Sequence, residues 1–303
     1  MSPPSSPVTR LLPSYALVTP VHDEASNLPR LVEAVVAQTA RPLEWVLVDD
    51  GSTDGTREHA RSLAHAHPWV RLVELPPSAA ATRGAPIVRS FLAGEATVDP
   101  SVEVVVKLDA DVSMDPDYFE RLLGEFAVDH ALGIASGTAL EWQDGEWRPR
   151  FGTGTSVWGA ARAYRRACLT AVSPLVERMG WDSVDEHKAQ LAGWRTRTFP
   201  GLAFRHHRAE GARDESQYGA WHRQGELAYY LGYRPSYLAL RTVYHLRQSP
   251  AAVGLVAGYL RSLVRRGERC PDPAVRRRVR ELQRLRSARS RMREKTGRSL
   301  SSG

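Results

Sequence analysis

The sequence has few cysteines and no long apolar run. Cys168 and Cys270 are its only two cysteines, and their spacing fits neither a zinc site nor a disulfide framework. It has no run of about 18 apolar residues, so a membrane-spanning helix is not expected. Residues 1–13, rich in serine and proline, lack the features of a signal peptide. We therefore expect a cytoplasmic protein whose metal, if it binds one, is held by oxygen or imidazole ligands.

Acidic residues are scarce towards the C-terminus. Residues 261–298 contain 15 arginines and lysines against 4 acidic residues, an excess of +11, whereas the whole chain carries +7. The remainder therefore sums to −4. A uniformly basic nucleic-acid-binding protein would not show this asymmetry, which favours a near-neutral globular domain with a cationic tail.

Short apolar runs alternate with helical patterns from Tyr15 onward, which is typical of βαβ units and a mainly parallel sheet. The predicted strands are 15–19, 45–48, 69–75, 102–108, 132–142 and 197–204. The predicted helices cover about 28–36, 53–67, 83–95 and 115–126, with a further short helix ending at residue 193. From about residue 223 the pattern is helical to the end.

Paired carboxylates follow two of these strands. Asp109 and Asp111 flank one alanine, so in an extended chain both side chains point the same way and suit one divalent cation. Asp49 and Asp50 follow the strand 45–48, and one of them is a candidate to accept a ring N–H of a nucleobase. Both pairs also have a simpler interpretation, as polar turns that precede a helix.

Four short motifs occur in the order and spacing of one enzyme family. They are Pro20-Val21-His22-Asp23-Glu24, Asp49-Asp50-Gly51-Ser52, Arg83-Gly84-Ala85 and Asp109-Ala110-Asp111. Over residues 15–210 the chain resembles the nucleotide-binding half of family 2 glycosyltransferases with the GT-A fold. The resemblance implies an α/β fold with a Rossmann-like, mixed but mainly parallel sheet flanked by helices. We expect a disordered segment (1–13), a catalytic domain (14–222) and a helical, arginine-rich extension (223–303).

The resemblance also implies a nucleoside-diphosphate-sugar donor, with UDP-sugar preferred, and a divalent cation, Mn²⁺ or Mg²⁺. The residues expected near the nucleoside or its phosphates are Pro20, Glu24, Asp49, Asp50 and Arg83. Asp109 is expected to meet the ribose or the metal, and Asp111 to ligate the metal.

A further part of the resemblance follows residue 150. Trp158 to Arg166 is similar to the family's small-residue segment followed by an aromatic-basic helix, in which Gly159 leaves room for the donor sugar. The alternative is a tightly packed junction without ligand contact.

Carboxylates next gather at Asp182, Asp185 and Glu186, ahead of Gly193, a candidate helix C-cap. In the family a carboxylate in this region is the general base on the acceptor hydroxyl. We favour Asp185, with the choice between it and Glu186 left open, because both are expected at the start of the helix, where its dipole holds a carboxylate. The alternative is that Asp185 and Glu186 only cap this helix.

Two histidines, His206 and His207, follow the last predicted strand. Imidazole suits a divalent ion and would complete a site begun by Asp111, and we favour His207 as that ligand. A surface histidine pair is the alternative.

In the C-terminal extension, a narrow apolar stripe lies on an arginine-rich helix and consists of Val275, Val279, Leu282 and Leu285. Such a helix either packs on the catalytic domain or lies on the inner face of an anionic membrane. Nucleic acid is a weaker alternative, because no aromatic side chains are interleaved with the arginines.

Together these features predict an inverting, metal-dependent glycosyltransferase of glycan or glycoconjugate synthesis, acting on a hydroxyl of a glycan, lipid-linked or small-molecule acceptor. A polyprenyl-phosphate sugar synthase is the alternative within the class, because Asn27-Leu28-Pro29 also resembles those enzymes. A nucleotidyltransferase or an inactive nucleotide-sugar-binding module is the alternative outside it. A nucleotidyltransferase is expected to carry a glycine-rich loop after the first strand, and Val21–Glu24 has no glycine.

Overall fold

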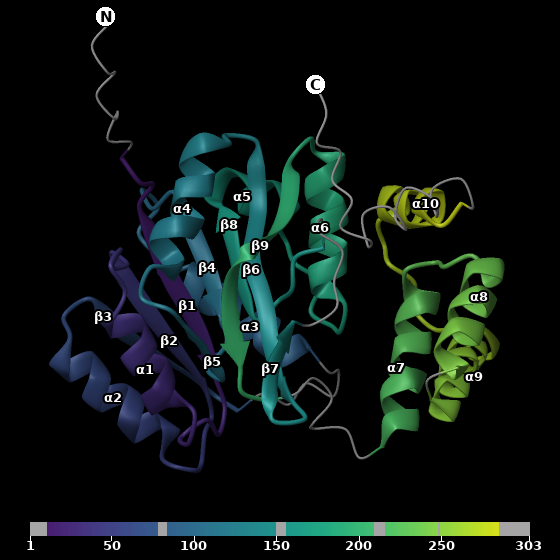
Figure 1. Cartoon of the computed structure of the whole chain (residues 1–303), viewed down its shortest axis with the longest axis horizontal. Coiled ribbons are helices and arrows are strands. Elements are labelled where there is room, and N and C mark those ends of the chain that lie inside the picture. The colour runs from purple at the N-terminus through teal and green to yellow at the C-terminus, as the bar shows by residue number, and fades with distance from the viewer. Residues whose placement is uncertain (1–10, 78–83, 150–155, 209–215, 248, 285–303) are drawn as a thin grey trace, which may run out of the picture.

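The computed structural model describes residues 11–77, 84–149, 156–208, 216–247 and 249–284 (Figure 1). Its strands are β1 (Tyr15–Val21), β2 (Glu44–Asp50), β3 (Val70–Leu75), β4 (Val104–Leu108), β5 (Val112–Met114), β6 (Leu132–Gln143), β7 (Glu146–Pro149), β8 (Ala161–Arg165) and β9 (Arg195–His206). Its α-helices are α1 (Leu28–Val36), α2 (Thr56–Ala66), α3 (Ala85–Glu95), α4 (Tyr118–Val128), α5 (Arg166–Val172), α6 (Trp181–Leu191), α7 (Gln217–Tyr230), α8 (Pro235–Leu246), α9 (Val253–Val264) and α10 (Pro273–Leu282).

The described strands form one mixed sheet in the order β3-β2-β1-β4-β8-β6-β9-β5, with β7 paired to β6. The strands β3, β2, β1 and β4 run parallel, and β6 runs parallel to β9. The strand β8 is antiparallel to both β4 and β6. The α/β, GT-A-like fold class expected from the sequence is confirmed.

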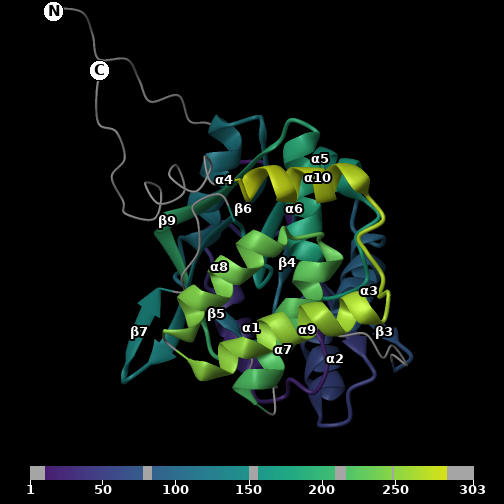
Figure 2. The same ribbon diagram turned by 90° about the vertical axis from the view of Figure 1, so that its right-hand side faces the viewer.

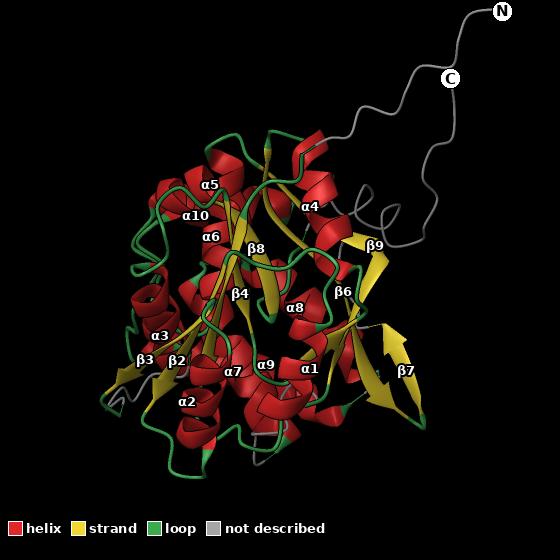
Figure 3. Cartoon of the chain, turned by 90° about the vertical axis from the view of Figure 1, so that its left-hand side faces the viewer, coloured by secondary structure: helices red, strands yellow, loops and turns green. Residues whose placement is uncertain are grey.

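Helices cover both faces of the sheet (Figure 3). On one face α1, α2 and α4 pack against Leu17, Trp45 and Val106, and on the other α3, α5 and α6 pack against Val18 and Val105. Because successive side chains of a strand point to opposite faces, the continuous apolar runs of β1, β2 and β4 supply both cores. Burial on both faces explains why these strands were readable from the sequence.

The segment from Trp158 to Arg166 differs from the expectation. Instead of a helix, Ala161–Arg165 forms β8, a strand inserted between β4 and β6. Alanine and arginine favour helices, but this segment pairs with β4 along its whole length and with β6 at Ala163 and Tyr164, and Tyr164 is buried. The short strands β5 and β7 were not expected either.

Two helix boundaries also differ, and one agrees. The helix α2 begins at Thr56 rather than near residue 53, because the intervening chain forms a turn in which Asp54 accepts hydrogen bonds from Thr56. The helix α6 begins at Trp181, after Gly180, and therefore contains both Asp185 and Glu186 in its second turn. Gly193 follows the end of α6 with φ +88°, as expected of a helix-terminating glycine.

The helical extension begins with α7, so the boundary expected at residues 222 and 223 lies inside that helix. The helices α7 and α9 pack closely because Gly225 and Gly258 leave no room for a side chain. A Cβ on Gly225 would lie 2.2 Å from the Leu255 carbonyl oxygen, and one on Gly258 would lie 1.9 Å from the His222 carbonyl oxygen. Figure 2 looks onto this part of the molecule, with α8 and α9 in the foreground.

The apolar stripe of α10 packs on the rest of the molecule. Val275 is 0% and Val279 4% exposed, and both lie in one cluster with Val184 of α6 and Tyr230 of α7. Leu285 lies outside the described residues. Of the two alternatives for this stripe, the packing one therefore holds for Val275 and Val279. Within the described ranges, no helix is long and apolar enough to span a membrane.

Candidate active site

The parallel strands β2, β1 and β4 end at one edge of the sheet, and β6 and β9 end there too. This edge is where open α/β sheets bind ligands. Pro20, Asp50 and Asp109 lie at the ends of their strands on this edge. The His22 ring nitrogen Nδ1 lies 2.8 Å from the Asp50 carbonyl oxygen, which joins the turns that follow β1 and β2.

Asp49 and Asp50 point to opposite faces of the sheet. Asp49 is fully buried and accepts hydrogen bonds from the Arg57 guanidinium at 2.7 Å and the Ser52 amide at 3.1 Å. Burial acts to raise the pKa of Asp49, but these hydrogen bonds outweigh it and hold the pKa below its ordinary value. Asp50 instead pairs with Arg89 of α3. Asp49 thus closes the turn before α2, whereas Asp50 lies on the side of the sheet that α3 covers.

A chain of charged side chains crosses the edge from β1 to β9. Arg208 donates to both carboxylate oxygens of Glu24, at 2.9 and 2.6 Å, and its guanidinium lies 3.6 Å from Asp111. Asp111 lies 3.4 Å from the His206 nitrogen Nε2. Burial acts to raise the pKa of Asp111, but His206 and Arg208 outweigh it and lower the pKa. This ion pair links Glu24 and Arg208, which are 184 positions apart in the sequence.

The histidine beside Asp111 is His206, whereas the metal ligand expected from the sequence is His207. In the antiparallel pair of β5 and β9, His206 lies opposite Val112, which places His206 beside Asp111. His207 faces the other way, with its Nε2 2.8 Å from the Ser113 hydroxyl and its ring edge-on to Trp147 at 5.3 Å. The imidazole beside the acidic motif is therefore that of His206.

A buried lysine holds the other carboxylate of the motif. Lys107 is 1% exposed, and its ammonium pairs with Asp109 and donates to the Gly159 carbonyl oxygen at 2.9 Å. Burial raises the pKa of Asp109, although the charge of Lys107 opposes the shift. A Cβ on Gly159 would lie 3.7 Å from Asp182 Oδ2 and 3.0 Å from the Trp181 ring. The donor motif and the start of α6 therefore meet at Gly159.

The three carboxylates of α6 have different surroundings. Asp182, in the first turn, is half-buried, and its Oδ1 accepts from the Ser183 amide at 3.0 Å. Asp185 is 1% exposed and pairs with Arg162 of β8 at 2.5 Å and with the Tyr164 hydroxyl. Burial raises the pKa of Asp185 to about 6, against the charge of Arg162. Asp185 is thus enclosed, and Asp182 faces Gly159.

Glu186 is also enclosed. It is 8% exposed, and its Oε2 accepts a hydrogen bond from the Val157 amide at 3.0 Å. Burial raises the pKa of Glu186 to about 8, so this carboxyl is largely neutral at pH 7. Neither Asp185 nor Glu186 caps α6, because both lie beyond its first turn. The capping alternative is therefore wrong for both.

The donor set fits a divalent cation that is shared with a substrate. Among the described residues, no three His, Cys, Asp or Glu side chains converge on one point as a complete metal cage. Asp109 and Asp111 nevertheless present carboxylates from one turn, and His206 presents its Nε2 to Asp111 at 3.4 Å. Mg²⁺ and similar ions in nucleotide enzymes typically take one or two carboxylates and complete their shell with phosphate oxygens and water.

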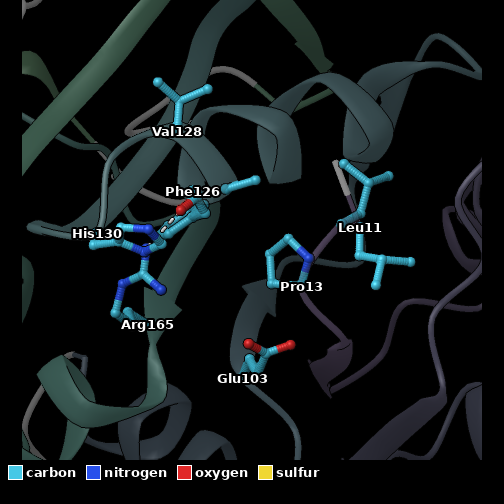
Figure 4. Close-up of a pocket in the computed structure, with 9 residues that line it drawn as sticks. Leu11, Pro13, Glu103, Phe126, Val128, His130 and Arg165 are labelled. Atoms are coloured by element: carbon cyan, nitrogen blue, oxygen red, sulfur yellow. Dashed lines mark hydrogen bonds between the residues drawn. The ribbon is translucent and has the colours of Figure 1, made fainter. Parts of the chain in front are cut away.

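A hollow of about 610 Å³ lies elsewhere, at the opposite edge of the sheet (Figure 4). It lies where β1 and β4 begin, between Pro13, Glu103 and Arg165, and Arg165 donates to the Phe126 carbonyl oxygen at 2.7 Å. It contains none of the carboxylates described above. The chemistry of the carboxyl edge, rather than this hollow, identifies the candidate site.

Three site residues were not expected from the sequence: Lys107, Arg162 and Arg208. Lys107 could have been found from its position inside the apolar run of β4. A lysine buried there needs an acidic partner, because buried lysines are paired. Arg162 was hidden by the helix expected there. Arg208 directly follows His206 and His207, and its pairing with Glu24 joins segments that are far apart in the sequence. Arg83, expected near the base or phosphates, lies outside the described residues.

Comparison with known proteins agrees with this geometry. Residues 16–177, more than half of the chain, match the sequence profile described as glycosyl transferase family 2. The chain belongs to this family. This glycosyltransferase is 31% identical over 121 residues to chondroitin synthase of Pasteurella multocida, which covers 40% of the chain and 12% of that protein. It is 30% identical over 175 residues to the polyprenol monophosphomannose synthase of Mycolicibacterium smegmatis, which covers 52% of the chain and 63% of that protein.

Among solved structures, the glycosyltransferase is similar to a mannosyltransferase from Pyrobaculum calidifontis in complex with GDP-Man and Mn²⁺. The TM-score is 0.56 at 17% identity, and the match covers 94% of this chain and 84% of that one. A structural likeness at this sequence identity shows the fold alone. The matches to the chondroitin synthase and the polyprenol monophosphomannose synthase each cover less than two thirds of that protein's length. The family membership removes the nucleotidyltransferase and binding-module alternatives.

Proposed function

We propose that this enzyme transfers a sugar from a nucleoside diphosphate, UDP in the first instance, to a hydroxyl group of an acceptor, with inversion at the transferred carbon. The observation that carries the proposal is the meeting at Gly159 of the acidic motif after β4 and the first turn of α6. One edge of the sheet thereby joins groups suited to hold a diphosphate with a carboxylate suited to accept a proton.

The donor occupies the half of the edge formed by β1, β2 and β4. Asp50 accepts from the nucleobase, and Pro20 and Glu24 form the wall of the turn after β1. Asp111, Asp109 and His206 would hold a divalent cation, which would supply positive charge to a departing diphosphate. Arg208, already paired with Glu24 and near Asp111, adds a positive charge beside the phosphates.

The general base is Asp182. Asp182 is half-buried and lies at the N-terminal turn of α6, where the helix dipole stabilises its charge. Asp185, the residue favoured on sequence grounds, is enclosed by Arg162 and Tyr164, so a bound hydroxyl has no access to it. Arg162 also donates to the Asp182 carbonyl oxygen at 2.9 Å and thus positions the backbone of the base. Asp185 and Arg162 act on the reaction through that position.

A polyprenyl phosphate is the second candidate acceptor. The match to a polyprenol monophosphomannose synthase over 175 residues favours it, and so does Asn27, whose amide donates to Glu24 at 2.7 Å in the turn where the sequence resembles those enzymes. A phosphate acceptor brings its own negative charge and needs no strong base. The two candidates therefore differ in their dependence on Asp182.

The test is a panel of nucleotide sugars offered to the purified enzyme with and without Mn²⁺, with release of nucleoside diphosphate as the readout. We expect one UDP-sugar to be hydrolysed fastest, and hydrolysis to require the cation. The panel is then repeated with hydroxyl and polyprenyl-phosphate acceptors. Preference for another base would correct the donor, and transfer only to the lipid phosphate would favour the second candidate. Absence of any cation-dependent hydrolysis would contradict the proposal.

A further inference from the structure

The outward faces of α8 and α9 expose large apolar side chains, seven aliphatic and one tyrosine. The exposed members, with their exposed fractions, are Leu240 (56%), Val243 (54%), Tyr244 (52%) and Leu246 (42%) on α8, and Val253 (52%), Leu260 (49%), Leu263 (45%) and Val264 (82%) on α9. We call these eight residues the α8–α9 surface. Single exposed aliphatic residues are ordinary, but a cluster on two adjacent helices marks an interaction site. Figure 2 shows both helices in the foreground.

The pattern on α9 is that of a helix with two apolar faces. Val253, Leu260 and Val264 recur at spacings that return to one side of a helix, and this side is exposed. The opposite side carries Gly254, Leu255 and Gly258, which are buried against α7. Packing within the chain therefore explains only one face of α9.

Positive charge predominates in the chain around this surface, and the acidic residues that flank it, Glu226 and Glu268, lie next to His222 and Arg178 respectively. Residues 227–267, a stretch that contains both helices, include six arginines and no lysine, aspartate or glutamate. Among them, Arg247, Arg261, Arg265 and Arg266 are exposed. Arg261 and Arg265 lie one turn apart on α9, beside the exposed apolar side. Apolar side chains flanked by arginines are the composition of helices that lie in the headgroup region of anionic membranes.

We infer that the α8–α9 surface docks the enzyme on an anionic lipid surface, with the aliphatic side chains in the interface and the arginines on the lipid phosphates. A second copy of the chain fits less well. Two copies joined through this surface would bring arginines towards arginines with no carboxylate in residues 227–267 to pair them. The lipid surface supplies the missing negative charge. This inference does not rest on the transfer reaction or its acceptor.

The α8–α9 surface is connected through packed helices to the first turn of α6, which carries Asp182. The helix α9 packs on α7, and Leu227 of α7 fills the space left by Gly180, where a Cβ would lie 2.3 Å from Leu227 Cδ1. Gly180 immediately precedes α6, whose first turn carries Asp182. Docking through α8 and α9 would therefore hold the first turn of α6 at a fixed distance from the membrane.

The experiment is co-sedimentation of the full chain with vesicles of phosphatidylcholine alone and with vesicles that also contain phosphatidylglycerol. We expect binding only to the anionic vesicles and weaker binding as salt is raised. The double variant Leu260→Gln/Val264→Gln should lower the partition coefficient at least about tenfold. Arg261→Gln/Arg265→Gln should lower it by a similar factor, since each arginine near a charged surface contributes about fivefold.

Two matched variants control for apolar area and charge elsewhere. Leu43→Gln/Val128→Gln removes exposed aliphatic residues from the catalytic domain, and Arg277→Gln/Arg284→Gln removes exposed arginines in and just after α10. Both should bind anionic vesicles within about twofold of the parent. Donor hydrolysis should be unchanged in all four variants, which separates this inference from the proposed function.

Three outcomes would overturn the inference. The first is no preference for anionic vesicles. The second is an equal loss of binding in the control variants, which would mean that net charge and not this surface is responsible. The third is a concentration-dependent dimer in sedimentation velocity that Leu260→Gln/Val264→Gln abolishes, which would identify the surface as an interface between copies.

Discussion

The donor half and the acceptor half of the site are built from the same kind of residue but use it differently. In the donor half, the carboxylates that follow or end three separate strands each pair with an arginine or lysine side chain. These carboxylates are Glu24, Asp50 and Asp109. In the acceptor half, Asp182, Asp185 and Glu186 lie within two turns of one helix. The donor half is thus fixed by sheet topology, whereas in the acceptor half the position of a carboxylate along α6 decides whether it is enclosed or partly exposed.

The largest expected effect distinguishes Asp182 from its neighbours. A positioned general base contributes about 10²–10⁴-fold, so Asp182→Asn should lose at least about 100-fold in transfer rate to a hydroxyl acceptor. Its nucleoside diphosphate dissociation constant should stay within about threefold, because the nucleotide is held on the donor half. Steady-state kinetics and calorimetry measure the two quantities. Equal rates in Asp182→Asn and the parent would mean that another group is the base, whereas transfer to a polyprenyl phosphate that does not depend on Asp182 would favour the lipid-phosphate acceptor.

The second effect is on stability and concerns Asp185. Removing its charge leaves Arg162 buried at 0% exposure without its counter-ion, a change that typically costs about 3–5 kcal/mol of unfolding free energy. Asp185→Asn should therefore be destabilised by about 3 kcal/mol or more in urea unfolding at pH 8, above the pKa of this carboxyl. The matched variant Asp182→Asn, half-buried one turn earlier, should change stability by less than about 1 kcal/mol. If Asp185→Asn kept full stability and lost transfer, the base would be Asp185.

The sequence predicted the donor half better than the acceptor half for physical reasons. The β-branched runs of β1, β2 and β4 are buried on both faces, so their ends, and the carboxylates after them, were readable. The start of α6 was not, because Gly180 stops the preceding chain without a recognisable capping side chain. Similarly, the choice between His206 and His207 depends on the register of the three-residue strand β5, which has no sequence signal of its own.

The third effect tests the cation on the donor half. Asp111→Asn removes a carboxylate beside His206, so Mn²⁺ should no longer strengthen nucleoside diphosphate binding. We expect the metal-dependent gain in affinity to fall by at least about tenfold in calorimetry. Ser113→Ala, which removes the partner of His207 on the other side of β5, is the matched control and should retain the gain. An undiminished gain in Asp111→Asn would place the cation elsewhere.

The smallest effect is a change in the pH dependence of stability caused by Glu186. Burial raises its pKa from 4.5 to about 8, so between these values the folded chain holds a proton that the unfolded chain has released. The stability that this carboxyl contributes is therefore complete below about pH 4.5 and is lost as pH rises through about 8.

Glu186→Gln keeps an acceptor for the Val157 amide but has no charge to bury. Relative to the parent, its unfolding free energy should rise by at least about 1 kcal/mol between about pH 5 and pH 9, because one pKa unit corresponds to about 1.4 kcal/mol. Glu58→Gln, on the exposed face of α2, should show no such rise, and the same flat difference in Glu186→Gln would mean that Glu186 is charged in the folded enzyme and competes with Asp182 as the base.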